Sequence, residues 1–259
     1  MKSKLIFVLS FFGSINLLSG FVYAQQQTFQ RSNINQELFW LRYHNKTILS
    51  EHWEWQTHLD DRRWFSPNQK RHHLLIRTQA FYHITKKISI SQGFVYALQH
   101  PQDPKSTSDL IVPEYRPFQE IVINNDLGKV IIRHRYRLEE RFVHKSTKTE
   151  LSDGFNFNWR LRYQFQAQKR LIKLDETRGI HFRVAEEIML NYGKNIEHNI
   201  FDQSRFSAAF LLNLNKNFDF EVGYSHWYQQ QRDGKTFFNR HIYRLTIFHS
   251  IDLRRKSTA

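Results

Sequence analysis

The 259 residues fit one domain or one large barrel, at 40% apolar, 15% aromatic and 24% charged composition. A formal net charge of +14 predicts attraction to anions, but charge alone does not choose between nucleic acid, anionic lipid and lipopolysaccharide phosphate. The lack of cysteine excludes both a disulfide framework and a lipoprotein attachment site.

The amino-terminal residues predict export. Two lysines precede the apolar run LIFVLSFFGSINLL, and Val22 and Ala24 stand where small residues precede a cleavage site. We therefore expect a signal peptide at 1–24 and a mature chain at 25–259, with an uncleaved anchor as the alternative. An exported chain of this size without disulfides fits a Gram-negative envelope, and export argues against nucleic acid as a partner.

The mature chain is expected to form strands. It has no run of about 18 apolar residues, so a transmembrane helix is not expected. The segment FNFNWRLRYQFQAQ instead alternates apolar and polar residues, whereas a helix needs apolar residues three and four apart. The same alternation predicts eleven strands, at residues 36–44, 52–62, 71–84, 87–99, 115–124, 129–143, 154–169, 180–192, 203–214, 217–230 and 239–252.

The connections between these strands roughly alternate in length. Short ones lie near residues 45, 85, 125 and 215, and longer ones follow residues 100, 144, 195 and 230. Such alternation is typical of outer-membrane barrels, although 63–68 is shorter and 171–178 longer than the pattern requires. Bacterial single-chain barrels have an even number of strands, so we expect ten to twelve.

Strand length and aromatic content favour a membrane barrel over a soluble one. Globular strands average about five or six residues, while a tilted membrane strand needs about 9 to 11. The apolar faces are rich in aromatic residues, as expected for girdles at two membrane interfaces. The predicted fold is therefore all-β, an antiparallel transmembrane β-barrel, located in the outer membrane.

The segment RHRYRLEERF, residues 133–142, places four arginines and a glutamate on one strand face. An arginine near the bilayer centre costs about 2–4 kcal/mol on the lipid face of a barrel, so this face should line the lumen. The next strands supply further charges. The predicted lumen-lining residues are Arg133, Arg135, Arg137, Glu139, Arg141, Arg160, Arg162, Arg183, Glu187 and Arg205.

Several motifs along the chain form a recognisable set. They are R-x-R-x-E-x-R at 135–141, R-x-R-Y at 160–163, E-E-I from Glu186, D-Q-x-R at 202–205, E-x-G-Y at 221–224 and N-x-H at 239–241. Together they resemble an uncharacterised family of bacterial outer-membrane β-barrels, the domain-of-unknown-function family twenty-four ninety. The resemblance covers most of the mature chain and is strongest from 128 to 252. It implies an outer-membrane barrel and gives no established activity.

The charged lumen allows two interpretations. Its side chains either form a salt-bridge and hydrogen-bond lattice that plugs the lumen, or create an anion-binding or anion-selective pore. The pore is the leading hypothesis, and a structural or lipid-binding envelope barrel is the alternative. Expected partners are outer-membrane lipids, lipopolysaccharide and the outer-membrane assembly machinery, with small anionic solutes as candidate ligands.

No enzymatic activity and no cofactor are expected. The 14 histidines lack a metal-binding spacing such as H-E-x-x-H. No nucleophile-elbow sequence occurs, and the adjacent Ser225 and His226 face opposite sides of a strand, so a membrane-embedded hydrolase is the weakest alternative. Glu140, Glu186 and His134 fall on otherwise apolar faces, which suggests positions near an interface or at a bulge.

Overall fold

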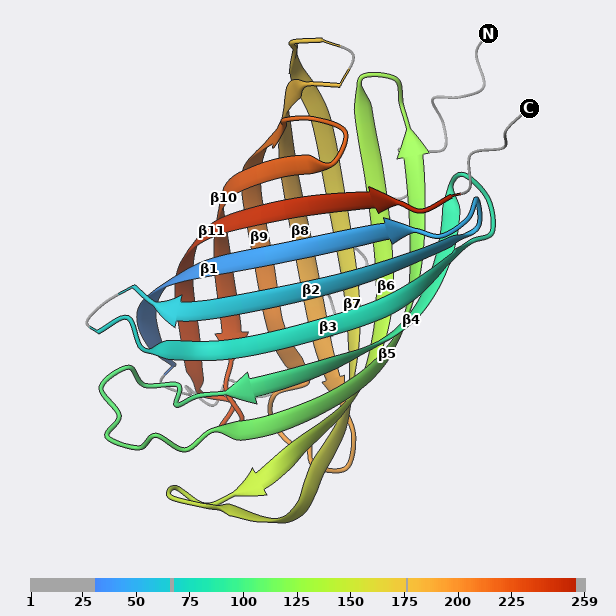
Figure 1. The fold of residues 1–259 in the computed structure, drawn as a ribbon. Helices are drawn as coiled ribbons and strands as arrows, with labels where there is room; N and C mark the ends of the chain where they lie inside the picture. The colour runs from blue at the N-terminus through green and yellow to red at the C-terminus, as the bar shows by residue number, and fades with distance from the viewer. Residues whose placement is uncertain (1–30, 66–67, 176, 255–259) are drawn as a thin grey trace, which may run out of the picture. The chain divides into compact units, whose positions relative to one another are not determined.

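The protein forms a closed all-β barrel of eleven strands between Ser32 and Asp252 (Figure 1). The structure is a computed structural model that describes residues 31–65, 68–175 and 177–254, so the predicted signal peptide lies outside the described residues. Within the described part, no helix is long and apolar enough to cross a membrane. The strands are β1 Ser32–Ile48, β2 Trp53–Trp64, β3 Arg71–His83, β4 Ile88–Gln99, β5 Val112–Asp126, β6 Val130–Ser146, β7 Leu151–Lys173, β8 Gly179–Tyr192, β9 Phe201–Asn213, β10 Phe218–Gln230 and β11 Thr236–Asp252.

Each strand predicted from the alternation is present, with bounds within four residues of those expected. The longest strand is β7, with 23 residues, because β6 and β7 continue to pair as a hairpin up to Ser146 and Leu151. Most of the segment LIKLDETR belongs to this strand or its tight turn, so the long connection expected at 171–178 is in fact short. Two-residue periodicity therefore located the strands well.

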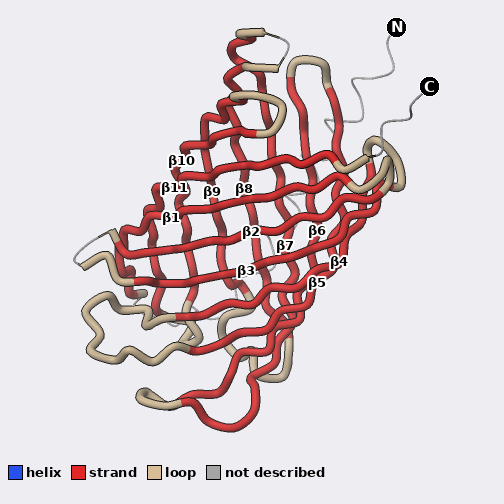
Figure 2. Tube along the Cα trace, in the orientation of Figure 1, coloured by secondary structure: helices blue, strands red, loops and turns tan. Residues whose placement is uncertain are grey.

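Barrel closure differs from the expectation of an even strand number. Consecutive strands pair antiparallel, but β1 and β11, which lie side by side (Figure 2), pair in parallel, as their arrows in Figure 1 show. Their pairing runs from Ser32 opposite Thr236 to Ile48 opposite Asp252. An even number is needed only when every neighbour is antiparallel. A parallel ladder also joins the backbone groups of the two edge strands, so it allows eleven described strands to close. The expectation of an even number is wrong for the described residues.

The barrel has two different ends. The connections at 49–52, 84–87, 127–129, 174–178 and 214–217 form one end, here called the turn end, and are three to five residues long. The other, called the loop end, carries the connections at 65–70, 100–111, 147–150, 193–200 and 231–235. The longest of these, at 100–111, has twelve residues. The loop-end connections at 100–111 and 193–200 are longer than any turn, as expected. Those at 147–150 and 231–235 have four and five residues, so the long connections expected after residues 144 and 230 are in fact short.

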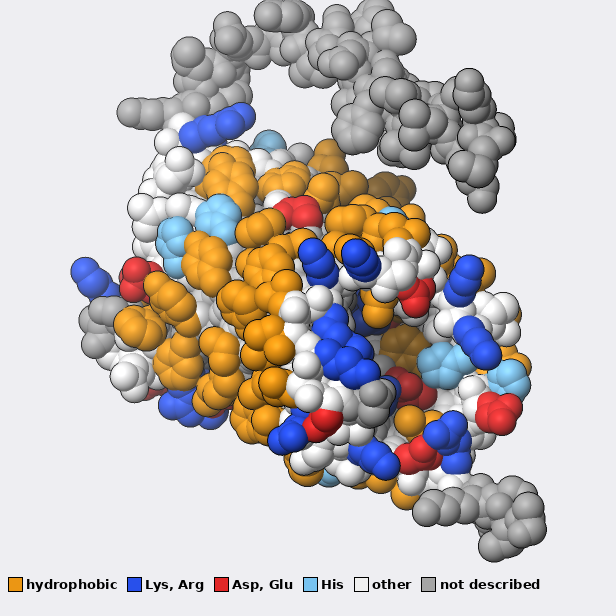
Figure 3. Space-filling model, turned by 90° about the horizontal axis from the view of Figure 1, so that it is seen from above, with side chains coloured by type: hydrophobic (Ala, Val, Ile, Leu, Met, Phe, Trp, Pro, Cys, Tyr) orange, Lys and Arg blue, Asp and Glu red, His pale blue; other side chains and the backbone are white. Residues whose placement is uncertain are grey.

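The outer face of the barrel is apolar and its inner face is mainly polar. Figure 3 shows a broad hydrophobic wall beside a hollow bordered by Lys and Arg side chains. Because side chains alternate across a strand, one face of each strand turns outward. Every strand exposes at least one large hydrophobic residue, for example Leu41, Trp55, Ile76, Phe94, Ile121, Tyr136, Leu161, Ile188, Phe210, Val222 and Tyr243.

The interior also contains two small apolar clusters. One joins Leu38, Trp40, Trp64, Trp227 and Ile242 near the loop end, and the other joins Leu75, Val95, Ala97 and Phe118. The Phe118 ring lies against Gly93 of the neighbouring β4, where a Cβ atom would stand 2.4 Å from its Cζ atom. Apolar packing therefore contributes to the lumen as well as charge.

Candidate functional site

The charged face of β6 points into the lumen, where Glu139 is the centre of an arginine cluster. This carboxylate is fully buried and accepts hydrogen bonds from Arg160 at 2.5 Å and Arg162 at 2.6 Å. Arg137 and Arg116 approach it at 3.6 and 3.8 Å. One carboxylate is thus surrounded by four guanidinium groups, and each of these also pairs with a second carboxylate.

Two more carboxylates continue the cluster toward the turn end. Glu187 accepts hydrogen bonds from Arg135 at 2.5 Å and from Arg162 at 2.9 Å. Glu120 accepts two from Arg137, at 2.5 and 2.7 Å. Bidentate or shared guanidinium–carboxylate contacts of this kind fix both partners geometrically. The strands β5 to β8 are therefore cross-linked inside the barrel by charge-assisted hydrogen bonds.

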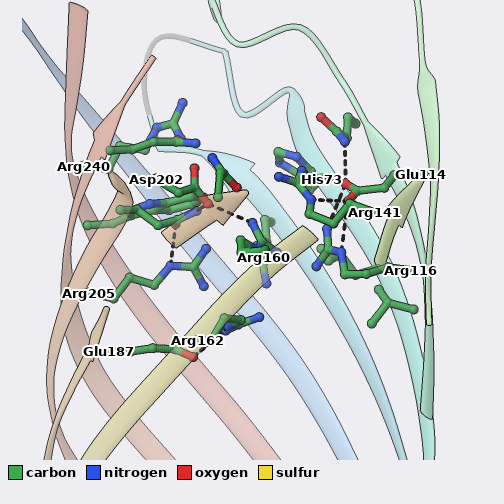
Figure 4. A pocket seen from close by; sticks show the side chains of 18 of the residues that line it. His73, Glu114, Arg116, Arg141, Arg160, Arg162, Glu187, Asp202, Arg205 and Arg240 are labelled. Atoms are coloured by element: carbon green, nitrogen blue, oxygen red, sulfur yellow. Dashed lines mark hydrogen bonds and ion pairs between the residues drawn. The ribbon is translucent and has the colours of Figure 1, made fainter. Parts of the chain in front are cut away.

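A second group of ion pairs lies nearer the loop end (Figure 4). Glu114 accepts hydrogen bonds from Arg141 at 2.6 Å and from Arg116 at 3.0 Å. Across the cavity, Arg160 also donates to Asp202 at 3.1 Å. Arg160 consequently binds carboxylates of two other strands, β6 and β9.

The remaining strands carry a similar lattice. Glu221 on β10 accepts hydrogen bonds from Arg183 at 2.5 Å and from Arg244 at 2.8 Å. Asp60 on β2 pairs with Arg42 of β1 at 2.5 Å. Ion pairs inside the lumen therefore involve most strands, but none involves β4, which has no charged residue. Such lattices hold a lumen rigid, although burying each charge offsets much of the gain from pairing.

The half of the lumen nearer the loop end contains a cavity of about 630 Å³ that reaches that end. Residues of the connections at 193–200 and 231–235 line its mouth, and its inner wall comes from all eleven strands. Thirteen arginines but only five carboxylates line it. The cavity therefore has a strongly positive lining, which would attract an anion.

Among the lining arginines that lie on strands, Arg77, Arg205 and Arg240 have no carboxylate within ion-pair distance among the described residues. Arg77 donates to His58 at 2.5 Å, and Arg205 donates to Gln203 at 2.9 Å. Arg240, which is 0% exposed, donates to three glutamine oxygens, those of Gln36, Gln102 and Gln229. Their hydrogen-bond partners are neutral groups, and Nε of Arg77 has no hydrogen-bond partner among the described residues, so their positive charge is uncompensated locally.

Aromatic rings support these cations at the loop end. Trp40 and Trp227 meet edge to face, with ring centroids 5.8 Å apart. The guanidinium of Arg205 lies 4.1 Å from the Trp227 ring, and that of Arg62 lies 4.0 Å from the Trp40 ring. Cation–π contacts hold a desolvated guanidinium without neutralising it. Both indole Nε1 atoms are buried and have no hydrogen-bond partner among the described residues.

The cavity has a floor on its turn-end side. On five strands the next inward-facing residue beyond the cavity is almost completely buried: Gln79, Phe118, Ala185, Ala209 and Thr246. On β4 and β10 that position is a glycine, Gly93 or Gly223, and the buried Ser91 and Glu221 follow it. Phe118 is 0% and Thr246 is 1% exposed. Side chains therefore fill the lumen below the cavity, which forms a cup that opens at the loop end.

The mouth of the cup carries an ordered carboxylate. Asp233 lines it and accepts hydrogen bonds from the hydroxyl of Thr236 at 2.6 Å and from its backbone N–H at 2.9 Å. These hydrogen bonds hold the pKa of Asp233 below its ordinary value, so the carboxylate stays charged near neutral pH. Asp233 and its neighbour Arg232 therefore place charges of opposite sign at the mouth.

The structure brings most of the predicted lumen residues together. Arg135, Arg137, Arg141, Arg160, Arg162, Glu187 and Arg205 line the cup. Glu139 is buried behind them, while Arg133 and Arg183 face the lumen closer to the turn end.

Sequence analysis missed about half of the charged lumen. Further lumen carboxylates and arginines were not identified. The carboxylates are Asp60, Glu114, Glu120, Asp202 and Glu221. The arginines are Arg42, Arg62, Arg116 and Arg244, which are paired, and Arg77 and Arg240, which are not paired with a carboxylate among the described residues. Two-residue spacing was the signal that could have found them. In PEYRPFQE, for instance, Glu114, Arg116 and Glu120 share one face.

The polar residues predicted on apolar faces do point outward, each with a polar partner. Glu140 lies 3.4 Å from Gln119, His134 bonds to Tyr163, and Glu186 accepts a hydrogen bond from Ser204. No β5–β6 pairing occurs beside Glu140, where β5 carries a proline that lacks an N–H donor. No group of three metal-ligating side chains occurs in the described ranges.

Comparison with known proteins gives structural relatives and a family. No curated protein matches the chain. LpxR from Salmonella typhimurium is similar over 76% of this chain and 83% of its own, with 8% identity and a TM-score of 0.44. LpxR is an outer-membrane lipid A deacylase, which contradicts the sequence-based prediction that a chain of this kind is not an enzyme. That prediction is withdrawn, but so distant a likeness assigns no reaction to this chain.

The family is shown by the sequence itself. A family model described as "Protein of unknown function (DUF2490)" matches residues 37–238, which span β1 to the first residues of β11. The match covers most of the barrel, including the arginine cluster around Glu139. The chain therefore belongs to this family, DUF2490, whose function is unknown.

Proposed function

We propose that this protein is an outer-membrane barrel whose cup binds a small anionic solute carrying phosphate or carboxylate groups. The observation that carries the proposal is the lining of the cup, thirteen arginines against five carboxylates. Arginine suits these groups because its planar fork donates two parallel hydrogen bonds. Arg205 is the leading anion-contacting residue, and the fully buried Arg240 adds positive charge behind it, since neither is neutralised by a carboxylate among the described residues.

The proposed orientation follows from the two ends of the barrel. Outer-membrane barrels have short turns on the periplasmic side and longer loops outside. The loop end would thus face the exterior, and the cup would open to it. The apolar outer wall would lie in the bilayer.

The floor of the cup supports binding over conduction. A pore needs a continuous aqueous path, whereas Gln79, Phe118 and Thr246 are almost fully buried below the cup. An anion could reach Arg205 from the loop end but would meet packed side chains beyond Arg77. The narrow anion-selective pore is therefore the weaker form of the hypothesis.

Calorimetric titration of the folded mature chain in a neutral detergent tests the binding proposal. Pyrophosphate and citrate are suitable probes, because one presents phosphates and the other carboxylates. We expect either probe to bind, and the double variant R205Q/R240Q to weaken binding at least tenfold. Arg63→Gln is the matched control, since Arg63 pairs with Asp61 outside the lumen. Equal binding by the double variant, or no binding by the wild type, would overturn the proposal.

Planar bilayer recordings separate a cup from a pore. The folded protein should give no steady current at moderate voltage. A steady anion-selective conductance, reduced in selectivity by Arg135→Ala, would replace the closed cup with an open channel.

A further inference from the structure

A row of polar side chains crosses the outward face of five adjacent strands near the loop end. It comprises Glu186, Ser204, His226, Asn239 and Asn35, from β8, β9, β10, β11 and β1. We call it the polar row. Its members face outward because the residues next to them, such as Glu187, Arg205 and Arg240, line the cup. The row is therefore separate from the proposed anion site.

The surroundings of the polar row are partly apolar, although His241 of β11 lies directly opposite His226. Ile188, Phe206 and Tyr243 expose 44%, 45% and 49% of their surfaces beside it. Ser204, Asn239 and Asn35 each lie three residues from the loop end of their strand. This places the row near the level where a membrane changes from headgroups to acyl chains. Polar groups on a lipid-facing wall are costly, and such residues usually mark a functional site.

Hydrogen bonds fix the half of the row that contains His226. Asn239 donates through Nδ2 to Asn35 at 2.8 Å, which turns its Oδ1 toward His226. His226 donates its Nε2–H to that oxygen. Because a neutral imidazole has one donor and one acceptor nitrogen, Nδ1 of His226 is left as an acceptor. It has no hydrogen-bond partner among the described residues.

The other half of the row also offers acceptors. Ser204 donates its hydroxyl hydrogen to Oε1 of Glu186, which leaves the lone pairs of Ser204 Oγ and of Glu186 Oε2. Together with His226 Nδ1, these acceptors lie on three adjacent strands, β8 to β10. At about 4.8 Å per strand spacing, they span roughly 10 Å.

We propose that the polar row binds the sugar headgroup of a glycolipid in the outer leaflet. Several hydroxyl donors, held about 10 Å apart by a saccharide, match these acceptors. A phosphodiester supplies no donor and is repelled by Glu186, while a single ammonium group is too compact to span three strands. The acyl chains would lie along Phe206 and Phe210, which follow Ser204 toward the turn end.

Native mass spectrometry of the folded full chain tests this assignment. The probes are three lipids with identical acyl chains, a glucosyl diacylglycerol, a phosphatidylethanolamine and a phosphatidylglycerol. The wild type should retain the glycolipid preferentially. Ser204→Ala and His226→Phe should each weaken its retention about fivefold, the effect of one lost hydrogen bond of about 1 kcal/mol.

Two control variants and two folding assays show whether a loss of glycolipid comes from the polar row itself. Ser204→Thr keeps a hydroxyl and should bind as the wild type does. His134→Phe removes an outward histidine paired with Tyr163, away from the row, and should leave retention unchanged. Circular dichroism and heat-modifiable electrophoretic mobility establish that each variant is folded. Equal retention of the three lipids by the wild type, or unchanged glycolipid retention in both folded row variants, would overturn the proposal.

Discussion

Glu139 on β6 and Arg160 on β7 stand directly opposite each other in the barrel wall and share a hydrogen bond of 2.5 Å inside the lumen. Arg160 also reaches Asp202 on β9, and Glu139 also accepts from Arg162. The pair thus links three strands, because its contacts join β6 and β7 to each other and to β9. Its removal should affect the stability of the barrel more than the binding of a ligand.

Glu139→Gln is expected to destabilise the barrel by about 3–5 kcal/mol, because it leaves several buried guanidinium groups without their carboxylate. Urea unfolding in lipid vesicles, followed by tryptophan fluorescence, measures the change. Glu150→Gln is the control, since Glu150 is exposed in the connection between β6 and β7. A Glu139→Gln barrel as stable as the wild type would show that the arginines find other partners.

Arg205→Gln should change the stability of the barrel far less than Glu139→Gln does. Arg205 has no carboxylate partner among the described residues, so its replacement removes an uncompensated buried charge as well as its stacking on Trp227. These two effects oppose each other, and we expect the free energy of unfolding to change by less than about 1 kcal/mol. Arg160→Gln, measured beside it, should lose about 3 kcal/mol or more. Equal losses in the two variants would assign Arg205 a structural role.

The tryptophans provide a test of which face meets lipid. Trp53 and Trp55 expose 49% and 42% of their surfaces on the outer wall, whereas Trp40, Trp64 and Trp227 expose 4% or less inside. Vesicles of brominated phosphatidylcholine should therefore quench fluorescence mainly through the outer residues. Trp53→Phe/Trp55→Phe should lower the quenched fraction, and Trp227→Phe should raise it. The reverse result would mean that the wall facing lipid has been misassigned.

Sequence periodicity predicted the strands because it reports a property of each segment alone. The charges of RHRYRLEERF could be assigned to the lumen, since lipid cannot accept Arg135 or Arg137 on its face. Their partners could not be identified in the same way. The Arg160–Asp202 contact joins residues 42 positions apart, and the Arg240–Gln102 contact joins residues 138 apart, so both depend on how the whole barrel closes.

The parallel closure was also beyond prediction, because β1 and β11 each look like an ordinary strand. Nothing in the sequence of either strand specifies the direction of its edge partner. The inward position of Trp40 and Trp227 has a similar cause. Aromatic residues suit both a girdle and a lumen. Trp40 and Trp227 can be assigned to the lumen only because Arg42 and Ser225, two residues along the same strands, face inward.

Gly93 should tolerate no side chain, although it lies in the middle of a strand. A Cβ atom there would stand 2.4 Å from the Phe118 ring, 2.5 Å from the Thr78 carbonyl oxygen and 2.6 Å from Gln79 Cβ. Because backbone and a packed ring cannot both move away, Gly93→Ala should cost about 1–3 kcal/mol, the usual cost of overpacking. Urea unfolding measures the loss, with Ser91→Ala on the same inward face of β4 as the control. Since Phe118 is part of the floor, relaxation of that ring should also let water deeper into the cup. An unchanged midpoint for Gly93→Ala would mean that Phe118 is not packed against β4, and the floor of the cup would then lose its main apolar support.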